Sequence, residues 1–153
     1  MFMAQKSWKA YTCYMKKLPI GISTFSQIRE EGYCYVDKTG FVSKLAESGK
    51  YFFISRPRRF GKSLFIDTLR EAFSCNKKLF EGLALENAWN WDRPYPVIHI
   101  SFGGGVISDR ADLETKISFL LDQNAHQLGN LSFSYRTVRE KFTELIQDRK
   151  SVV

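Results

Sequence analysis

Eight residues between an apolar run and an amphipathic stretch constrain the fold of this chain more than any other feature. They occupy positions 56–63 and read Arg-Pro-Arg-Arg-Phe-Gly-Lys-Ser, with four cations and no acid. The apolar run at 51–54 is typical of a buried strand, and the spacing of apolar residues after the loop predicts a helix. A loop that only faces solvent has no need for so dense a positive charge, whereas a loop that binds an anion before a helix does.

The loop fits the phosphate-binding pattern G-x-x-x-x-G-K-[ST] at seven of eight positions, with Arg56 in place of the first glycine. In this pattern the backbone amides form a concave nest for phosphate oxygens, and the helix N-terminus adds its positive dipole end. Gly61 lets the main chain approach the ligand, Lys62 reaches the β- and γ-phosphates, and Ser63 offers a hydroxyl to magnesium. Arg56 is either strained or holds an ordinary φ, and both interpretations stay open.

The predicted cofactors are therefore ATP and Mg²⁺, with a catalytic role for Lys62 and a metal-ligating role for Ser63. The residues predicted to contact the nucleotide are Arg56, Pro57, Arg58, Arg59, Phe60, Gly61, Lys62, Ser63 and Leu64, together with Asp37. Asp37 has two interpretations: it caps the helix that follows it, or it lies beside the base or ribose. Arg58 and Arg59 either contact phosphates or pair with acids of a segment that is missing from this chain. A basic loop without a ligand is the alternative for the whole motif.

The chain as a whole alternates apolar runs with amphipathic stretches, which predicts an α/β fold with a parallel sheet flanked by helices. Strands are expected at 33–36, 51–54 and 97–102. Helices are expected after a cap at Ser23 or Thr24, before Gly49, after Gly61, after a cap at Ser108 or Asp109, and from near Ser134. Residues 151–153 are typical of the start of a further strand, so the sheet is expected to be incomplete at the C-terminus.

The net charge of +7 is concentrated in two short patches. Residues 1–17 hold four lysines and no acid, and residues 55–62 hold three arginines and one lysine. The total of 23 bases less these eight leaves 15, which nearly balance the 16 acids. The first patch predicts a basic N-terminal tail over 1–17. A basic nucleic-acid-binding or protein-binding module that uses no nucleotide is the alternative function.

Composition also excludes several classes of protein. No apolar run approaches the roughly 18 to 20 residues that cross a bilayer, and no secretory signal is visible. The cysteines Cys13, Cys34 and Cys75 are scattered and have no metal-binding spacing, so reduced thiols in a cytoplasmic protein are expected. Trp89 and Trp91 are expected to pack around a turn rather than to stack on bases.

Three separated motifs resemble the N-terminal part of the AAA-ATPase-like family of P-loop NTPases, which is related to archaeal-type ATPases. They are Leu18-Pro19-Ile20-Gly21, Tyr35-Val36-Asp37-Lys38-Thr39 and the run from Arg56 to Leu64. The segments at 79–87 and 95–102 are similar to that family as well, so the resemblance extends from residue 18 to the end of the chain. An arginine before the proline is usual in the family.

The resemblance implies an ATP-binding P-loop domain over 18–153 that ends before the Walker B acids, which would hold magnesium and polarise water. Hydrolysis is therefore expected to need residues beyond this chain, and enzymatic activity is left open. Members of the family often carry a nuclease-like domain, so the resemblance allows nucleic acid as a partner. It also allows an oligomer. A small-molecule kinase is a third, less favoured hypothesis, because no acceptor site or lid is visible.

Overall fold

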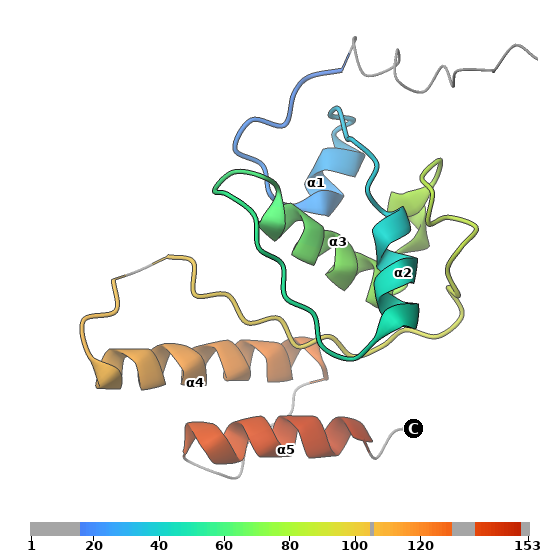
Figure 1. The fold of residues 1–153 in the computed structure, drawn as a ribbon. Helices are drawn as coiled ribbons and strands as arrows, with labels where there is room; N and C mark the ends of the chain where they lie inside the picture. The colour runs from blue at the N-terminus through green and yellow to red at the C-terminus, as the bar shows by residue number, and fades with distance from the viewer. Residues whose placement is uncertain (1–15, 105, 130–136, 151–153) are drawn as a thin grey trace, which may run out of the picture. The chain divides into compact units, whose positions relative to one another are not determined.

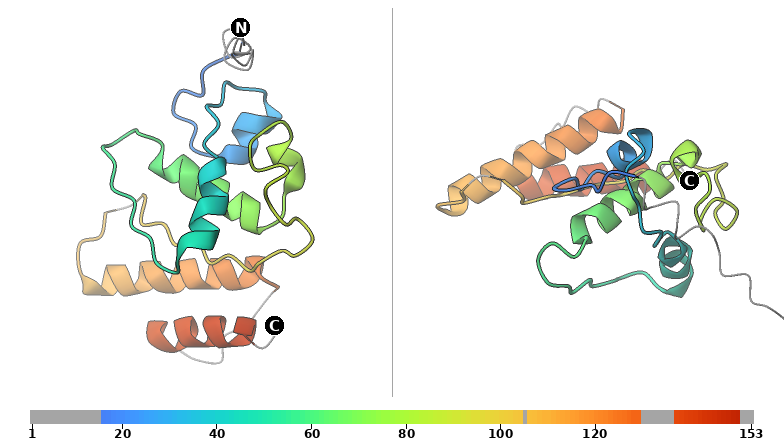
Figure 2. Two further views of the ribbon diagram at one scale, coloured as in Figure 1. Left: turned by 45° about the vertical axis from the view of Figure 1, so that its right-hand side comes forward. Right: turned by 90° about the horizontal axis from the view of Figure 1, so that it is seen from above.

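The computed structural model describes residues 16–104, 106–129 and 137–150, except for the side chains of 148–150. The chain divides into two compact units, Met1–Tyr95 and Pro96–Val153. The first contains α1 (Phe25–Glu30), α2 (Gly40–Ser48), α3 (Lys62–Phe73) and the short 3₁₀ helix η2 (Lys77–Phe80). The second contains α4 (Arg110–Gln127) and α5 (Val138–Lys150), which lie side by side (Figures 1 and 2).

The described residues form no β-strand, so the predicted parallel sheet is wrong. A strand needs a ladder of backbone hydrogen bonds to a neighbour, and an apolar run predicts an extended shape without providing that neighbour. Segment 33–36 makes only scattered bonds, such as Cys34 N–H to Lys17 O at 2.9 Å. Segment 97–102 bonds to the side chain of Asn124, and segment 51–54 makes no backbone bond to a described residue. The expected strand start at 151–153 lies outside the described residues.

The core of the first unit forms where α1, α2, α3 and the segment after η2 meet. Its buried side chains are those of Phe25, Val42, Ala72, Phe80 and Leu85. The ring of Phe25 lies 4.9 Å from that of Phe80 and 5.2 Å from that of Tyr35, centroid to centroid. Burial raises the pKa of the Tyr35 phenol above its ordinary value.

A carboxylate from α3 holds the start of α1. The backbone N–H of Phe25 donates to Asp67 Oδ2 at 2.6 Å, and Arg70 Nη2 lies 2.8 Å from Asp67 Oδ1. Helix α1 has six residues and no side-chain cap of its own. Because so short a helix is unstable alone, its first amide depends on this contact with α3.

Both predicted packing tryptophans anchor the loop that closes the first unit, which confirms that interpretation. Trp89 Nε1 donates to Ala72 O at 3.1 Å, and Trp91 Nε1 donates to Glu86 O at 2.8 Å. Their rings pack against the buried core of this unit. Each indole therefore buries its apolar body while its N–H is satisfied by a backbone carbonyl.

The second unit is a helical pair that packs around Leu121, Ala125 and Leu145. Asp109 caps α4 by accepting a hydrogen bond from Asp112 N–H at 2.8 Å, so of the two predicted caps, Ser108 and Asp109, it is Asp109 that serves. Lys141 of α5 reaches across to α4, where its Nζ lies 2.9 Å from Ser118 Oγ and from both oxygens of Asp122. These contacts join the two helices on the flank of their apolar interface.

One buried amide ties the extended segment of the second unit to α4. Asn124 is 4% exposed; its Oδ1 accepts from His99 N–H at 2.7 Å and its Nδ2 donates to His99 O at 2.9 Å. Replacing Asn124 by alanine is expected to destabilise this unit by about 1 to 3 kcal/mol, because both backbone groups of His99 lose their partner. Urea unfolding followed by far-UV circular dichroism measures the change. The exposed neighbour Gln123 is the control, and an equal loss in Gln123→Ala would contradict the assignment.

One of the two cysteines that the structure describes differs from the expectation of reduced thiols. Cys34 is disulfide-bonded, whereas Cys75 is free. Cys75 follows the end of α3 with a φ of 58°, and burial raises the pKa of its thiol. The sequence spacing alone did not reveal this difference, because disulfide pairing is set by tertiary proximity.

Candidate phosphate-binding loop

The segment before α3 is an exposed loop that leads straight into the helix (Figure 1). The backbone is irregular through Pro57, turns at Arg58 and Arg59, and becomes helical at Lys62. Gly61 is the N-cap residue and has a left-handed φ of 73°. The predicted loop-to-helix boundary is thus confirmed, whereas the strand expected before it is not.

The backbone of this loop alternates in handedness just before the helix. Arg59 has a φ of 65° and Gly61 a φ of 73°, and Phe60 between them has no positive φ. Successive residues of opposite handedness turn their N–H groups toward the same side and form an anion-binding nest. Arg56 is not among the residues with positive φ, which decides in favour of an ordinary φ at that position. The strained arginine is Arg59 instead.

The first turn of α3 presents unsatisfied amides at this nest. Among the described residues, the first backbone N–H at this end that donates a hydrogen bond is that of Phe65, to Gly61 O at 3.0 Å. No side chain caps the helix, and no acid lies in its first turn. The amides of Lys62, Ser63 and Leu64 therefore keep their hydrogen-bonding capacity, and the positive end of the helix dipole is not neutralised locally.

The ammonium group of Lys62 folds back over the loop. Lys62 Nζ donates to the carbonyl of Arg56 and, at 3.3 Å, to that of Pro57. These contacts close the loop across five to six residues and hold the cation beside the nest. The loop pattern predicted a role for Lys62 but not these contacts with the carbonyls of Arg56 and Pro57, for which the short spacing between Arg56 and Lys62 was the available signal.

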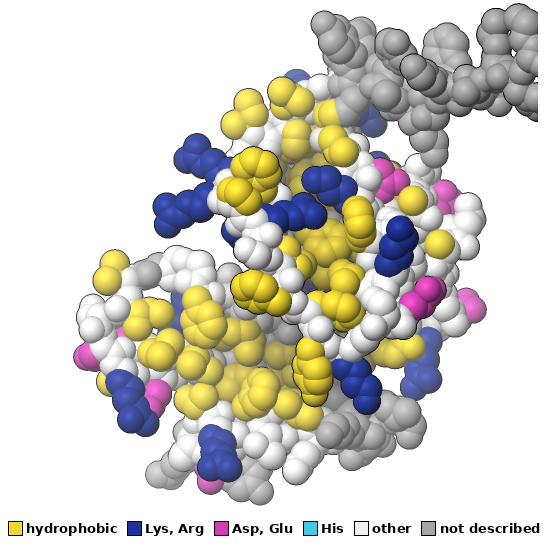
Figure 3. All heavy atoms as spheres, viewed as in Figure 1, with side chains coloured by type: hydrophobic (Ala, Val, Ile, Leu, Met, Phe, Trp, Pro, Cys, Tyr) yellow, Lys and Arg dark blue, Asp and Glu magenta, His cyan; other side chains and the backbone are white. Residues whose placement is uncertain are grey.

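The other cations of the loop point into solvent. Arg56, Arg58 and Arg59 are exposed, and no ion pair within the described part of the chain involves them. Figure 3 shows basic side chains projecting where this loop lies. Both alternatives for Arg58 and Arg59, contact with phosphates and pairing with acids of a missing segment, therefore stay predictions.

Asp37 lies at the start of α2, where its carboxylate binds backbone and hydroxyl groups. Its Oδ1 accepts from Thr39 N–H at 2.9 Å and from Thr39 Oγ1 at 2.7 Å, and its Oδ2 accepts from Ala84 N–H at 2.7 Å. Thr39 Oγ1 in turn accepts from Leu85 N–H at 3.2 Å. Through these contacts Asp37 joins the start of α2 to the segment after η2. Its contact with a nucleotide stays a prediction.

The chain is similar to one known family of proteins. The family model described as "Predicted AAA-ATPase" matches residues 19–152. The chain belongs to the AAA-ATPase-like family. It is 56% identical over 133 residues to an uncharacterised protein encoded in the vnfD 5′ region of Azotobacter chroococcum mcd 1. That match covers 86% of this chain and 26% of the relative, so the chain spans about a quarter of the relative's length. No solved structure matches it.

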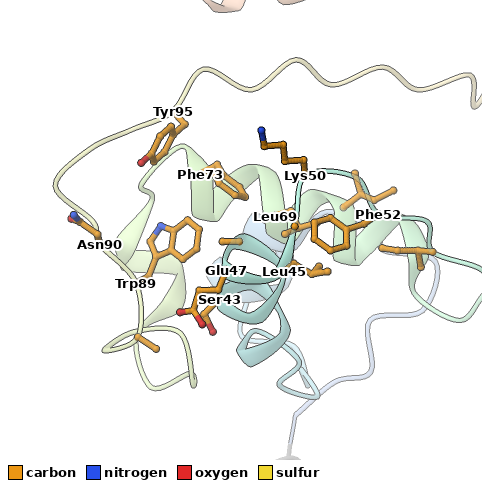
Figure 4. A pocket seen from close by; sticks show the side chains of 15 residues that line it. Ser43, Leu45, Glu47, Lys50, Phe52, Leu69, Phe73, Trp89, Asn90 and Tyr95 are labelled. Atoms are coloured by element: carbon orange, nitrogen blue, oxygen red, sulfur yellow. The ribbon is translucent and has the colours of Figure 1, made fainter. Parts of the chain in front are cut away.

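The first unit of this AAA-ATPase-like chain also contains an apolar hollow of about 870 Å³. Its walls come from the end of α2, one side of α3 and the loop that carries Trp89 and Tyr95 (Figure 4). Phe52, Leu69 and Phe73 line it. No residue of the 56–63 loop contributes to its lining, so the hollow and the candidate phosphate site are separate features.

Two kinds of feature, a metal-binding cluster and a membrane-spanning helix, are absent from the described residues. Among the described residues, no three side chains of histidine, cysteine, aspartate or glutamate gather as a metal site would require. Likewise, no helix within the described ranges combines the length and apolar character needed to cross a membrane.

The left-handed backbone conformation of Gly61 can be tested by substitution. A Cβ there would meet no atom within 4 Å, so only the left-handed φ opposes a side chain. Gly61→Ala is expected to destabilise the first unit by about 1 kcal/mol. Gly40 in α2 has an ordinary helical setting, and Gly40→Ala should be neutral or slightly stabilising. Urea unfolding monitored by tryptophan fluorescence compares them, and equal effects would contradict the assigned strain.

Proposed function

We propose that this AAA-ATPase-like chain binds ATP with Mg²⁺ through the loop at 56–63. The observation that supports this most directly is the convergence of three groups at one point. These groups are the alternating backbone from Arg59 to Gly61, the uncapped amides of α3, and the Lys62 ammonium beside them. Each of these favours a negatively charged ligand, and together they suit the consecutive phosphates of a nucleotide.

Each residue has a chemical role in this proposal. The nest and the helix amides donate to phosphate oxygens, and Lys62 exchanges its carbonyl contacts for the β- and γ-phosphates. Ser63 lies exposed in the first helical turn, where its hydroxyl can ligate Mg²⁺ bridging the same phosphates. Arg58 and Arg59 are placed to neutralise further phosphate charge from the solvent side.

We propose binding rather than efficient hydrolysis for this chain. The carboxylates in the body of α3 are already engaged: Asp67 holds Phe25 N–H and Arg70, and Glu71 bonds to Arg70 and Asn76. Both are largely buried away from solvent. Neither is therefore available to position a water molecule or a metal ion at the loop.

Isothermal titration calorimetry with ATP, in the presence and absence of Mg²⁺, tests the proposal. ATP with Mg²⁺ should bind, ADP should bind more weakly, and AMP should give no heat because it lacks the phosphates that reach Lys62 and the nest. Absence of heat with ATP and Mg²⁺ on a sample with native circular dichroism would refute the proposal.

A second candidate function rests on the solvent-facing arginines. Arg58 and Arg59 have no acidic partner among the described residues, and the neighbouring Phe60 is 63% exposed. Arginines beside an exposed aromatic ring suit a single-stranded nucleic acid, through phosphate contacts and base stacking. Fluorescence anisotropy with an oligonucleotide distinguishes the candidates: steep salt dependence without competition by ATP favours nucleic acid, and competition favours the nucleotide site.

A further inference from the structure

The side chain of Thr68 connects the first turn of α3 with the segment that precedes α2. Thr68 is 0% exposed, and its Oγ1 donates to Leu64 O at 2.8 Å. A threonine hydroxyl within a helix can bond in this way to the carbonyl four residues earlier. The phenol of Tyr35, which comes from outside the helix, forms a hydrogen bond with the same side chain. Thr68 therefore has a second partner, and this partner belongs to the segment at 35–39.

The protons of these groups fix the direction of the contacts. A threonine hydroxyl has one proton and two acceptor lone pairs. Because Thr68 donates its proton to Leu64 O, it accepts a hydrogen bond from the Tyr35 O–H. The phenol oxygen accepts in turn from the backbone N–H of Lys38. A continuous relay, the Tyr35–Thr68 relay, therefore runs from Lys38 N–H through both hydroxyls to the carbonyl of Leu64.

The segment that carries Tyr35 is itself held in place. The ring of Tyr35 packs edge-on against that of Phe25, with the centroids 5.2 Å apart. Asp37, the neighbour of Lys38, accepts from Ala84 N–H at 2.7 Å through its Oδ2. Burial raises the pKa of the Tyr35 phenol, so its proton is present at neutral pH and can be donated. The relay thus starts from a fixed point outside α3.

The other end of the relay lies in the turn of α3 that presents free amides to the candidate phosphate site. The N-cap residue Gly61 has no side chain to cap this turn. Helix ends without other support fray. A hold on the Leu64 carbonyl from outside the helix limits this motion in the turn that carries the amides of Lys62, Ser63 and Leu64. Donors that are already ordered bind a ligand without the cost of ordering them.

We propose that Tyr35 is a positioning residue of the phosphate site, which through Thr68 holds the first turn of α3 in the conformation that binds phosphate. This role rests on the proposed binding of ATP with Mg²⁺, and Tyr35 itself does not contact the ligand. It gives the segment at 35–39 a part in the site through its contact with α3. If the phenol only stabilised the fold, its loss would lower stability and leave the affinity of the folded chain unchanged.

Isothermal titration calorimetry with ATP and Mg²⁺ on the full chain compares variants that each remove one hydroxyl. Tyr35→Phe keeps the ring against Phe25, and Thr68→Val keeps the branched shape of the side chain. Each should weaken binding by about three- to tenfold, the equivalent of one neutral hydrogen bond. Thr68→Ser retains the hydroxyl and should bind within about twofold of the parent. The double variant should bind no more weakly than either single variant, because one broken link already interrupts the relay.

Two control variants remove similar hydroxyls elsewhere in the chain. The phenol of Tyr33 bonds to Glu31, so Tyr33→Phe leaves the relay intact. Thr143 of α5 makes the same kind of bond as Thr68, from its Oγ1 to Arg139 O at 2.9 Å, and Thr143→Val removes it. Both controls should bind ATP like the parent. Urea unfolding of every variant verifies that the titrated sample is folded, so that a change in affinity is not a loss of folded chain.

Nuclear magnetic resonance of the isotope-labelled chain without nucleotide supplies a readout that does not depend on binding. Hydrogen bonds in a chain polarise one another, so breaking the first link alters the bond at the last. The carbonyl ¹³C resonance of Leu64 should therefore shift in both Tyr35→Phe and Thr68→Val. It should stay in place in Tyr33→Phe and in Thr143→Val.

Three results would overturn the positioning role while leaving the proposed function standing. They are a parent that binds ATP and relay variants that bind as tightly, a Thr68→Ser variant that loses as much affinity as Thr68→Val, and a Leu64 resonance that stays in place in both relay variants. A folded parent that gives no heat with ATP and Mg²⁺ would instead refute the proposed function, and the positioning role with it.

Discussion

Replacing Lys62 by alanine is expected to reduce the affinity for ATP with Mg²⁺ by about a hundredfold or more. The ammonium group is the cation that the structure holds against the loop itself, through the carbonyls of Arg56 and Pro57. Hydrogen bonds to a charged group contribute about 1.5 to 3 kcal/mol each, and Lys62 would donate to two phosphates. The alanine variant also loses the contact that closes the loop, so the nest is less well organised before the ligand arrives.

Two matched variants separate these effects in calorimetric titrations. Lys62→Arg keeps the charge but cannot reproduce a compact ammonium group, so it should recover only part of the affinity. Lys50→Ala removes an exposed lysine of the same unit that lies outside the loop and should bind like the parent. If Lys62→Ala bound ATP as tightly as the parent, the assignment of the loop as the nucleotide site would be wrong.

Replacing Phe25 by alanine is expected to destabilise the first unit by about 3 to 5 kcal/mol. Phe25 is 0% exposed, and its ring packs on those of Tyr35 and Phe80. Truncation removes this buried surface and leaves a cavity between α1 and the residues around it. The N–H of the same residue donates to Asp67, so the cavity opens beside the contact that holds the start of α1. Such a loss is a large part of the stability of a domain of this size.

Urea unfolding monitored by tryptophan fluorescence measures the effect, because Trp89 and Trp91 lie in this unit. Phe41→Ala is the matched control: Phe41 is 53% exposed on α2, and its loss should cost under about 1 kcal/mol. Similar losses for both variants would show that Phe25 does not occupy the core described above.

The helices were predictable because their signals are local. The boundary at Gly61 and Lys62 was predicted from the loop pattern, and a cap at Ser108 or Asp109 from their place before an amphipathic stretch. The last helix was expected from near Ser134, whereas the described helix begins at Val138. Residues 130–136 lie outside the described part of the chain, so the earlier start is not tested.

The prediction of a sheet was wrong because an apolar run does not show whether another strand lies beside it. Segments 51–54 and 97–102 have the composition of buried strands, and composition favours an extended backbone facing apolar surroundings. A sheet also needs a neighbour at hydrogen-bonding distance, which depends on residues far along the chain. In the described residues the neighbour of His99 is the side chain of Asn124, and segment 51–54 has none.

The candidate site was predicted in its residues but not in its backbone. Gly61, Lys62 and Ser63 lie together at the start of α3, as the pattern required. The left-handed conformation of Arg59 was not foreseen, because arginine has no preference for it and the surrounding loop must impose it. Asp37 was assigned two roles, and the structure documents the clamp to Thr39 and Ala84.

The sequence by itself determined the start of α3 and which loop carries the density of cations, because capping, turn formation and charge depend on residues within a few positions of each other. Only the tertiary structure decided that Asp67 holds α1 from 42 residues away and that Asn124 replaces a strand partner for His99 from 25 residues away. It also decided that segment 51–55 pairs with no other part of the chain that the structure describes. Contacts of that range depend on which surfaces meet when the chain compacts, and no local pattern encodes which surfaces those are.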